Sequence, residues 1–182
     1  MAITTPLSSS SSRRFKRVLK QDPDNTAALL GLAGIYQNAN RFQEAHDTFL
    51  IASRANPQNP IPFYSIGAID WIMVFDRNKP LPLGEQFLLV DEGLSNLDSA
   101  LALNPQYEDA MTYKNLLLRE KARLVVDPEE KARLTKLADE WFNRALETRK
   151  SKALERTTGR PVGPSSGVSP LPPPLPPPPP EE

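Results

Sequence analysis

The sequence contains no cysteine and only one histidine among its 182 residues. The absence of cysteine excludes disulfides, thiolate-bound zinc or iron–sulfur centres, and a thiol nucleophile. A single histidine, His46, cannot form a multi-histidine metal site. The formal net charge is zero, with 22 basic and 22 acidic residues, which argues against a general nucleic-acid binder. Long apolar runs are also missing, so we expect no membrane insertion and a cytoplasmic location.

Proline, by contrast, is abundant, and 11 of the 20 prolines lie between residues 161 and 180. Proline lacks a backbone donor, so this tract predicts a polyproline II conformation in a disordered tail over residues 158–182. The tail has two interpretations. It is either a stiff spacer or a ligand for polyproline-binding domains, since it contains the minimal PxxP pattern. The residues that would form the ligand are Pro170, Pro173, Leu175, Pro176 and Pro179.

The N-terminal residues 1–12 include five consecutive serines and predict a second disordered tail. Charge is unevenly distributed despite the zero total. Residues 1–21 hold five bases and no acid, residues 22–112 hold twelve acids and four bases, and residues 113–160 hold thirteen bases and eight acids. This pattern indicates either a solvated helical surface or an acidic central face that meets a basic partner.

Three further prolines lie at spacings that indicate a sequence repeat. Pro23, Pro57 and Pro105 each follow an Asp or Asn, and each lies five and eight residues after small or apolar side chains. Proline ends a helix, and the preceding Asn or Asp favours the turn. The first spacing is 34 residues and the second is 48, which predicts one repeat period and then a lengthened one.

The first full unit shows two helical stripes. One helix carries Leu29, Leu32, Ala33 and Tyr36, and after a turn at residues 38–41 a second helix carries Phe42, Ala45, Phe49 and Ala52. At these positions the sequence resembles the tetratricopeptide repeat, a helix–turn–helix unit of about 34 residues. Leu29 replaces the tryptophan that the family commonly has.

The resemblance implies an all-α fold, a short α-solenoid of antiparallel helix pairs over residues 13–157, with disordered N- and C-terminal tails. We predict a half-repeat over residues 13–23, followed by repeats over residues 26–59, 60–107 and 108–152. The long second and third units resemble a bacterial group of these proteins. The lone half-repeat leads us to expect a truncated or alternatively started N-terminus, which leaves export uncertain.

The resemblance also implies a non-catalytic module that binds a protein or peptide partner in a concave groove. Trp71 has two interpretations, as a core anchor or as part of the groove wall. The family's charged clamp for a terminal carboxylate is absent, so we expect an apolar or aromatic peptide. The alternative is an adaptor whose proline-rich tail makes the contact. The candidate groove residues are Leu30, Gln37, Asn38, Ile61, Tyr64, Trp71, Thr112, Leu116 and Arg119.

No residue pattern predicts an enzyme. His46 lies beside the apolar stripe of its helix, where an exposed side chain is expected, and it has no recognisable serine nucleophile as partner. A phosphate-binding glycine loop is missing as well. We therefore predict no catalytic residue, no cofactor and no metal site, and we expect the exposed repeat ends to offer a route to self-association.

Overall fold

The structure is a computed structural model that describes residues 7–76 and 78–157. Every regular element in this part of the chain is an α-helix. The helices are α1 (Leu7–Gln21), α2 (Thr26–Asn38), α3 (Phe42–Ala55), α4 (Pro60–Phe75), α5 (Leu83–Leu103), α6 (Glu108–Leu124) and α7 (Pro128–Thr157).

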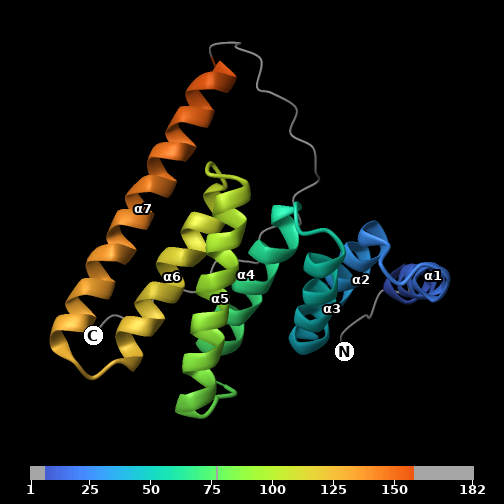
Figure 1. Ribbon diagram of the computed structural model, residues 1–182, viewed down its shortest axis with the longest axis horizontal. Coiled ribbons are helices and arrows are strands. Elements are labelled where there is room, and N and C mark those ends of the chain that lie inside the picture. Colours follow the sequence, from blue (N-terminus) through green and yellow to red (C-terminus); the bar gives the residue numbers. More distant parts are fainter. Residues whose placement is uncertain (1–6, 77, 158–182) are drawn as a thin grey trace.

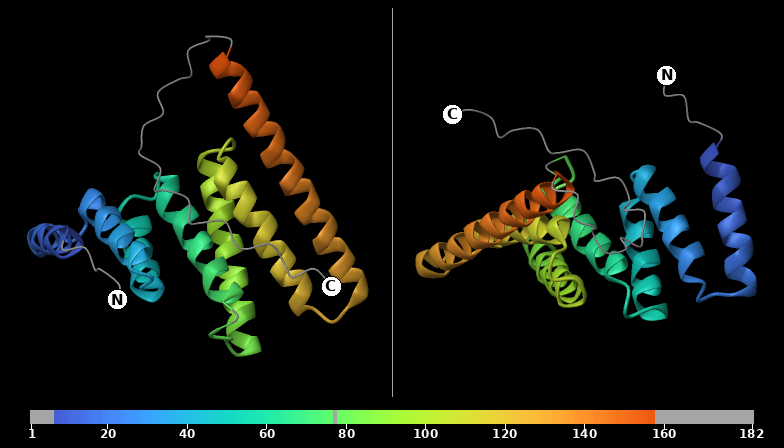
Figure 2. Two further views of the ribbon diagram at one scale, coloured as in Figure 1. Left: turned by 180° about the vertical axis from the view of Figure 1, so that it is seen from behind. Right: turned by 90° about the horizontal axis from the view of Figure 1, so that it is seen from above.

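Successive helices pack against one another in chain order, from α1 at one end of the molecule to α7 at the other (Figures 1 and 2). Helices α2 and α3, α4 and α5, and α6 and α7 form antiparallel hairpins, and α4 also lies against α6. This arrangement confirms the predicted all-α solenoid of helix pairs.

Asparagine side chains two residues after the prolines cap the helices that follow these turns. The Asn25 side chain accepts a hydrogen bond from the Ala28 N–H at 3.0 Å and caps α2, and Asn59 accepts from Ile61 N–H at 3.0 Å to cap α4. Between α2 and α3, Asn40 has a φ of 56°. Asparagine tolerates this left-handed conformation better than most residues, which explains a turn of only three residues there.

The predicted boundary of the N-terminal tail is wrong in part. We placed residues 1–12 in a disordered tail, but α1 begins at Leu7 and includes the serines. Serine costs a helix only a few tenths of a kcal/mol per residue. The amphipathic segment from Arg13 onward can therefore extend through the serine run. The predicted proline-rich tail and its candidate ligand residues lie outside the described residues.

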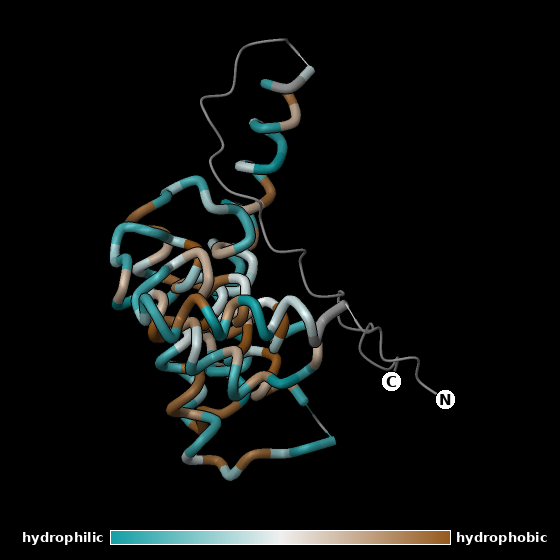
Figure 3. The backbone as a smooth tube through the Cα atoms, turned by 90° about the vertical axis from the view of Figure 1, so that its right-hand side faces the viewer, coloured by the Kyte–Doolittle hydropathy of each residue, from teal (hydrophilic) through white to brown (hydrophobic). Residues whose placement is uncertain are grey.

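Apolar side chains between the helices form two main cores, and hydrophobic stretches gather in the middle of the stack (Figure 3). The first core joins α2 and α3 to one side of α4 and is made by Leu32, Ala33, Tyr36, Ala45, Phe49, Ile66 and Ile69. The second core joins the other side of α4 to α5, α6 and α7. Its largest contributors are Tyr64, Trp71, Leu97, Tyr107, Met111, Tyr113 and Leu117. Helix α4 therefore belongs to both cores.

Candidate functional site

The candidate groove residues lie on α2, α4 and α6, the first helices of the three hairpins. Most of them remain accessible. Asn38 and Arg119 are exposed, and five others are half-buried: Leu30, Gln37, Ile61, Thr112 and Leu116. Leu30 packs partly against the first core, and Leu116 packs partly against the second.

Tyr64 and Trp71 do not form an accessible groove wall. Only 4% of Tyr64 and 5% of Trp71 is exposed. The Tyr64 ring lies 4.9 Å from Tyr107 and 5.7 Å from Tyr113, and Trp71 stacks on Phe75 at 4.8 Å. Because α6 packs directly on α4, these rings fill the space between the two helices. Trp71 is therefore a core anchor, and both residues leave the set of accessible candidates.

Arg119 is exposed but already engaged. Its Nη2 lies 2.6 Å from Asp139 Oδ1 on α7, and its Nε donates to Asn115 Oδ1 at 2.9 Å. These contacts direct the guanidinium toward α7. The accessible candidates without such an ion pair on the first two hairpins are Leu30, Gln37, Asn38 and Ile61.

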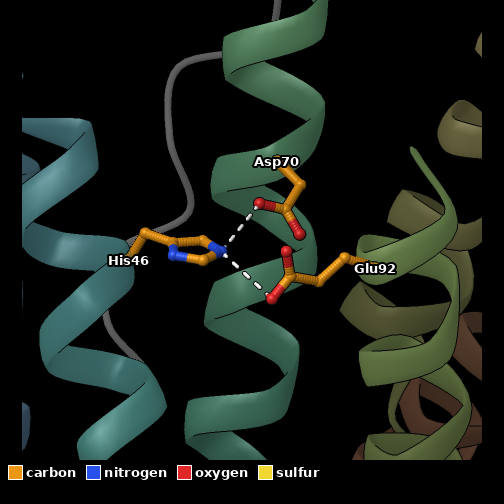
Figure 4. Close-up of side chains that lie close together, drawn as sticks. All are labelled: His46, Asp70 and Glu92. Carbon is orange, nitrogen blue, oxygen red and sulfur yellow. Dashed lines mark ion pairs between the residues drawn. The ribbon is translucent and has the colours of Figure 1, made fainter. Parts of the chain in front are cut away.

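His46 is not the exposed residue that we predicted, because only 6% of it is accessible. Its Nε2 lies 3.2 Å from Asp70 Oδ1 on α4 and 3.7 Å from Glu92 Oε1 on α5 (Figure 4). Its Nδ1 is 3.6 Å from Asp47 Oδ1. The position beside the stripe of α3 is covered because α4 of the next hairpin packs on it.

Asp70 is fully buried, with 0% exposure, and neither of its oxygens has a hydrogen-bond partner among the described residues. Burial raises the pKa of Asp70 to about 6, although the nearby His46 opposes this shift. The pKa of His46 is raised, chiefly by its contact with Asp70, while its own burial acts in the opposite direction. The pair is therefore a coupled, buried histidine–carboxylate contact.

The cluster of His46, Asp70 and Glu92 was missed from the sequence. One signal was present, since Asp70 occupies a repeat position where an aromatic side chain is expected. A carboxylate at a buried position requires a compensating group. The sequence alone could not show that this group would be His46 from the preceding hairpin.

Comparison with known proteins agrees with the hairpin geometry. Residues 12–65, which span most of α1 together with α2, α3 and the start of α4, match the family model described as tetratricopeptide repeat. Residues 12–65 are therefore similar to a tetratricopeptide repeat. The bacterial group suggested by the longer second and third hairpins stays a prediction.

Two solved structures resemble the stack of helical hairpins in this chain. The crystal structure of MamA is 20% identical, with a TM-score of 0.48, and the match covers 79% of this chain and 89% of that one. A second, titled crystal structure of MamA protein, is 19% identical, with a TM-score of 0.49 and coverage of 79% and 83%. No curated protein matches the sequence.

Within the described residues, no helix is long and apolar enough to cross a membrane. Tetratricopeptide repeats generally serve as protein-interaction scaffolds and are non-catalytic. The repeat match in residues 12–65 therefore supports a scaffold role for this chain.

Proposed function

We propose that this protein is a non-catalytic interaction module that binds a protein or peptide through the accessible face of α2 and the start of α4. The observation that carries the proposal is that Leu30, Gln37, Asn38 and Ile61 stay accessible within the stretch that matches the tetratricopeptide repeat. Tyr64 and Trp71, buried in the second core, take no part in this surface.

The chemistry of this face indicates the kind of partner. Helix α2 contains no charged residue, and the only charged residue of α4 is the buried Asp70. A face with apolar and amide side chains and no exposed charge favours an apolar or aromatic segment over an acidic one. Charged residues on a ligand would lose hydration here without gaining an ionic partner.

The proposal is tested by adding charge without changing side-chain size. The double variant Gln37→Glu, Asn38→Asp places two carboxylates on this face. A matched control, Gln58→Glu with Asn143→Asp, adds the same two charges at exposed positions in the α3–α4 turn and on α7. Affinity purification from the native host, followed by mass spectrometry, compares the partners retained by each protein.

We expect the first variant to lose partners that the control and the unmodified protein retain, with the same circular dichroism spectrum for all three. If all three proteins retain the same partners, α2 is not the binding face.

The alternative function is an adaptor whose proline-rich tail makes the contact, and the PxxP pattern in the sequence favours it. Deletion of residues 158–182 separates the two functions, because the proposed face lies wholly within the helices. Partners retained by the deleted protein would support the α2 face, and partners lost with the tail would support the adaptor.

Self-association through the repeat ends remains a further proposal. Apolar side chains are accessible at both ends of the solenoid, with Val18 on α1 38% exposed and Phe142 on α7 51% exposed. A stacked assembly would cover such ends. Light scattering across a range of protein concentrations would detect it as a mass that rises with concentration and falls in Phe142→Glu.

A further inference from the structure

The buried cluster of His46, Asp70 and Glu92 joins two hairpins. His46 projects from α3 of the first hairpin, and Asp70 and Glu92 project from α4 and α5 of the second (Figure 4). One nitrogen or oxygen from each of the three side chains lies within 4.8 Å of the other two. We propose that these three residues bind a divalent transition-metal cation such as Zn²⁺.

The spacing of the donor atoms suits a single ion. Ligand atoms that share a zinc ion each lie about 2.0–2.2 Å from it, which places them roughly 3.0–3.6 Å from one another. His46 Nε2 is 3.2 Å from Asp70 Oδ1 and 3.7 Å from Glu92 Oε1. Glu92 has the adjustable side chain of the three, since 40% of it is exposed, so a small rotation brings its oxygen into place.

The electrostatics of the cluster also favour a cation. Asp70 is wholly buried, and neither of its oxygens nor either nitrogen of His46 has a hydrogen-bond partner in the described part of the protein. No lysine or arginine among the described residues forms an ion pair with Asp70 or Glu92; Lys121, for example, pairs with Asp91 instead. A buried carboxylate is costly unless its charge is compensated, and among the described residues His46 is the side chain that pairs with Asp70. A metal ion at this position would compensate Asp70 and Glu92 together.

The types of ligand select the metal. Ca²⁺ and Mg²⁺ prefer a shell made entirely of oxygen, whereas an imidazole nitrogen combined with carboxylates suits Zn²⁺ or a neighbouring transition metal. Three protein ligands leave a fourth position for water. Asp47 Oδ1, 3.6 Å from His46 Nδ1, is positioned to orient the imidazole from the other side once the exposed Asp47 side chain moves slightly closer.

A bound ion would connect α3 to α4 and α5, where the two hairpins meet. Because an ion that binds the folded state stabilises it, metal should strengthen this junction. The competing interpretation is a metal-free contact between a protonated His46 and Asp70, with Glu92 at its edge. The two interpretations differ in whether Zn²⁺ raises the melting temperature of the unmodified protein.

The test uses the full chain without a histidine tag, purified with chelator and then titrated with ZnCl₂ by calorimetry. MgCl₂ serves as the comparison metal. We expect saturation at one Zn²⁺ per chain and no comparable signal with Mg²⁺. Glu92→Gln should weaken Zn²⁺ binding by about tenfold or more. Glu85→Gln removes the same charge from an exposed position on α5 and should leave binding unchanged.

The effect of Zn²⁺ on the melting temperature separates the two interpretations. Asp70→Asn retains the size of the side chain and removes the buried charge, so the metal site predicts that Zn²⁺ raises the melting temperature of the unmodified protein and not that of this variant. A metal-free ion pair predicts that Zn²⁺ never raises it, even in the unmodified protein. The proposal is overturned if the unmodified chain shows no saturable Zn²⁺ binding. Equal Zn²⁺ affinity in Glu92→Gln and Glu85→Gln, or in Asp70→Asn and the unmodified protein, would overturn it as well.

Discussion

At the scale of single residues, the glycines differ in how much room their helices leave for a side chain. A methyl group at Gly67 on α4 would lie 2.5 Å from Leu97 Cγ and 3.0 Å from the Gly93 carbonyl oxygen. At Gly34 on α2, no atom would lie within 4 Å of it. The first glycine is therefore required by the contact between α4 and α5, and the second is not.

We predict opposite effects of alanine at these two positions. Gly67→Ala overpacks the α4–α5 contact and should lower the free energy of unfolding by about 1–2 kcal/mol, even after the gain in helix propensity. Gly34→Ala gains the propensity alone and should raise this free energy by about 0.5–1 kcal/mol. Urea denaturation measures both. A destabilised Gly34→Ala would show that α2 packs more closely than the structure indicates.

At the scale of elements, α1 is held to the solenoid by few side chains. The Phe15 ring lies over Gly31 of α2, and Phe15 and Leu19 pack against the first core, while Val18 is 38% exposed. The helix has no hairpin partner of its own among the described residues. Its stability therefore depends on this contact with α2.

We predict that Phe15→Ala releases α1 and leaves the hairpins folded. Losing most of a partly buried ring should lower stability by about 2 kcal/mol. The free energy that is lost should be mainly that of docking α1 on α2. Hydrogen exchange should show faster exchange of the α1 amides and little change in α4–α7. Val18→Ala is the control and should change exchange little. If the α1 amides keep their protection in Phe15→Ala, another contact holds the helix.

Three buried tyrosines lie together where α4 meets α6: Tyr64 on α4, Tyr113 on α6, and Tyr107 directly before α6. Burial raises the pKa of Tyr64, Tyr107 and Tyr113. Above the unfolded pKa of about 10, the folded state retains phenol protons that the unfolded state loses, so stability falls as the pH rises. Each such tyrosine contributes a slope of about 1.4 kcal/mol per pH unit.

We therefore predict unfolding at alkaline pH, and we predict that Tyr64→Phe shifts its midpoint to higher pH. Circular dichroism measured across pH 9–12 follows the transition. Near neutral pH this substitution should change stability little, since it keeps the ring. An unchanged alkaline midpoint in Tyr64→Phe would mean that this phenol does not contribute to the transition.

Sequence and structure agree on elements and differ on contacts between them. The helices and turns follow from local patterns, such as the stripe of Leu29, Leu32 and Ala33, and a periodic sequence is sufficient to predict them. The burial of His46 and Trp71 depends on how closely one hairpin packs on the next. That distance is set by many side chains together, so it could not be deduced from the repeat pattern.

At the scale of the whole molecule, α4 belongs to both cores among the described residues: Ile66 and Ile69 pack in the first core, and Tyr64 and Trp71 pack in the second. Both tryptophans of the chain pack in or against the second core. Tryptophan fluorescence therefore reports on the C-terminal part of the solenoid, whereas circular dichroism reports on all helices.

We predict that Ile69→Ala uncouples the two cores. Ile69 is fully buried, so the truncation should lower the free energy of unfolding by about 2–4 kcal/mol. Most of this loss should affect the first core. In urea, the circular dichroism midpoint should fall below the fluorescence midpoint. Leu117→Ala, in the second core, should instead lower the fluorescence midpoint. Midpoints that fall together in Ile69→Ala would show a single cooperative unit.

The second hairpin also shows how this solenoid accommodates additional sequence. Helix α4 has 16 residues against 13 in α2, α5 has 21 against 14 in α3, and the loop between them has seven residues against three. Together these differences account for the longer spacing between Pro57 and Pro105, while the turns on either side of this hairpin keep the same length of four residues. The additional residues lie at the end of the hairpin that is farther from the proline turns connecting it to its neighbours. The segment between α4 and α5 is thus a natural position for grafting a foreign peptide or an affinity epitope onto the scaffold.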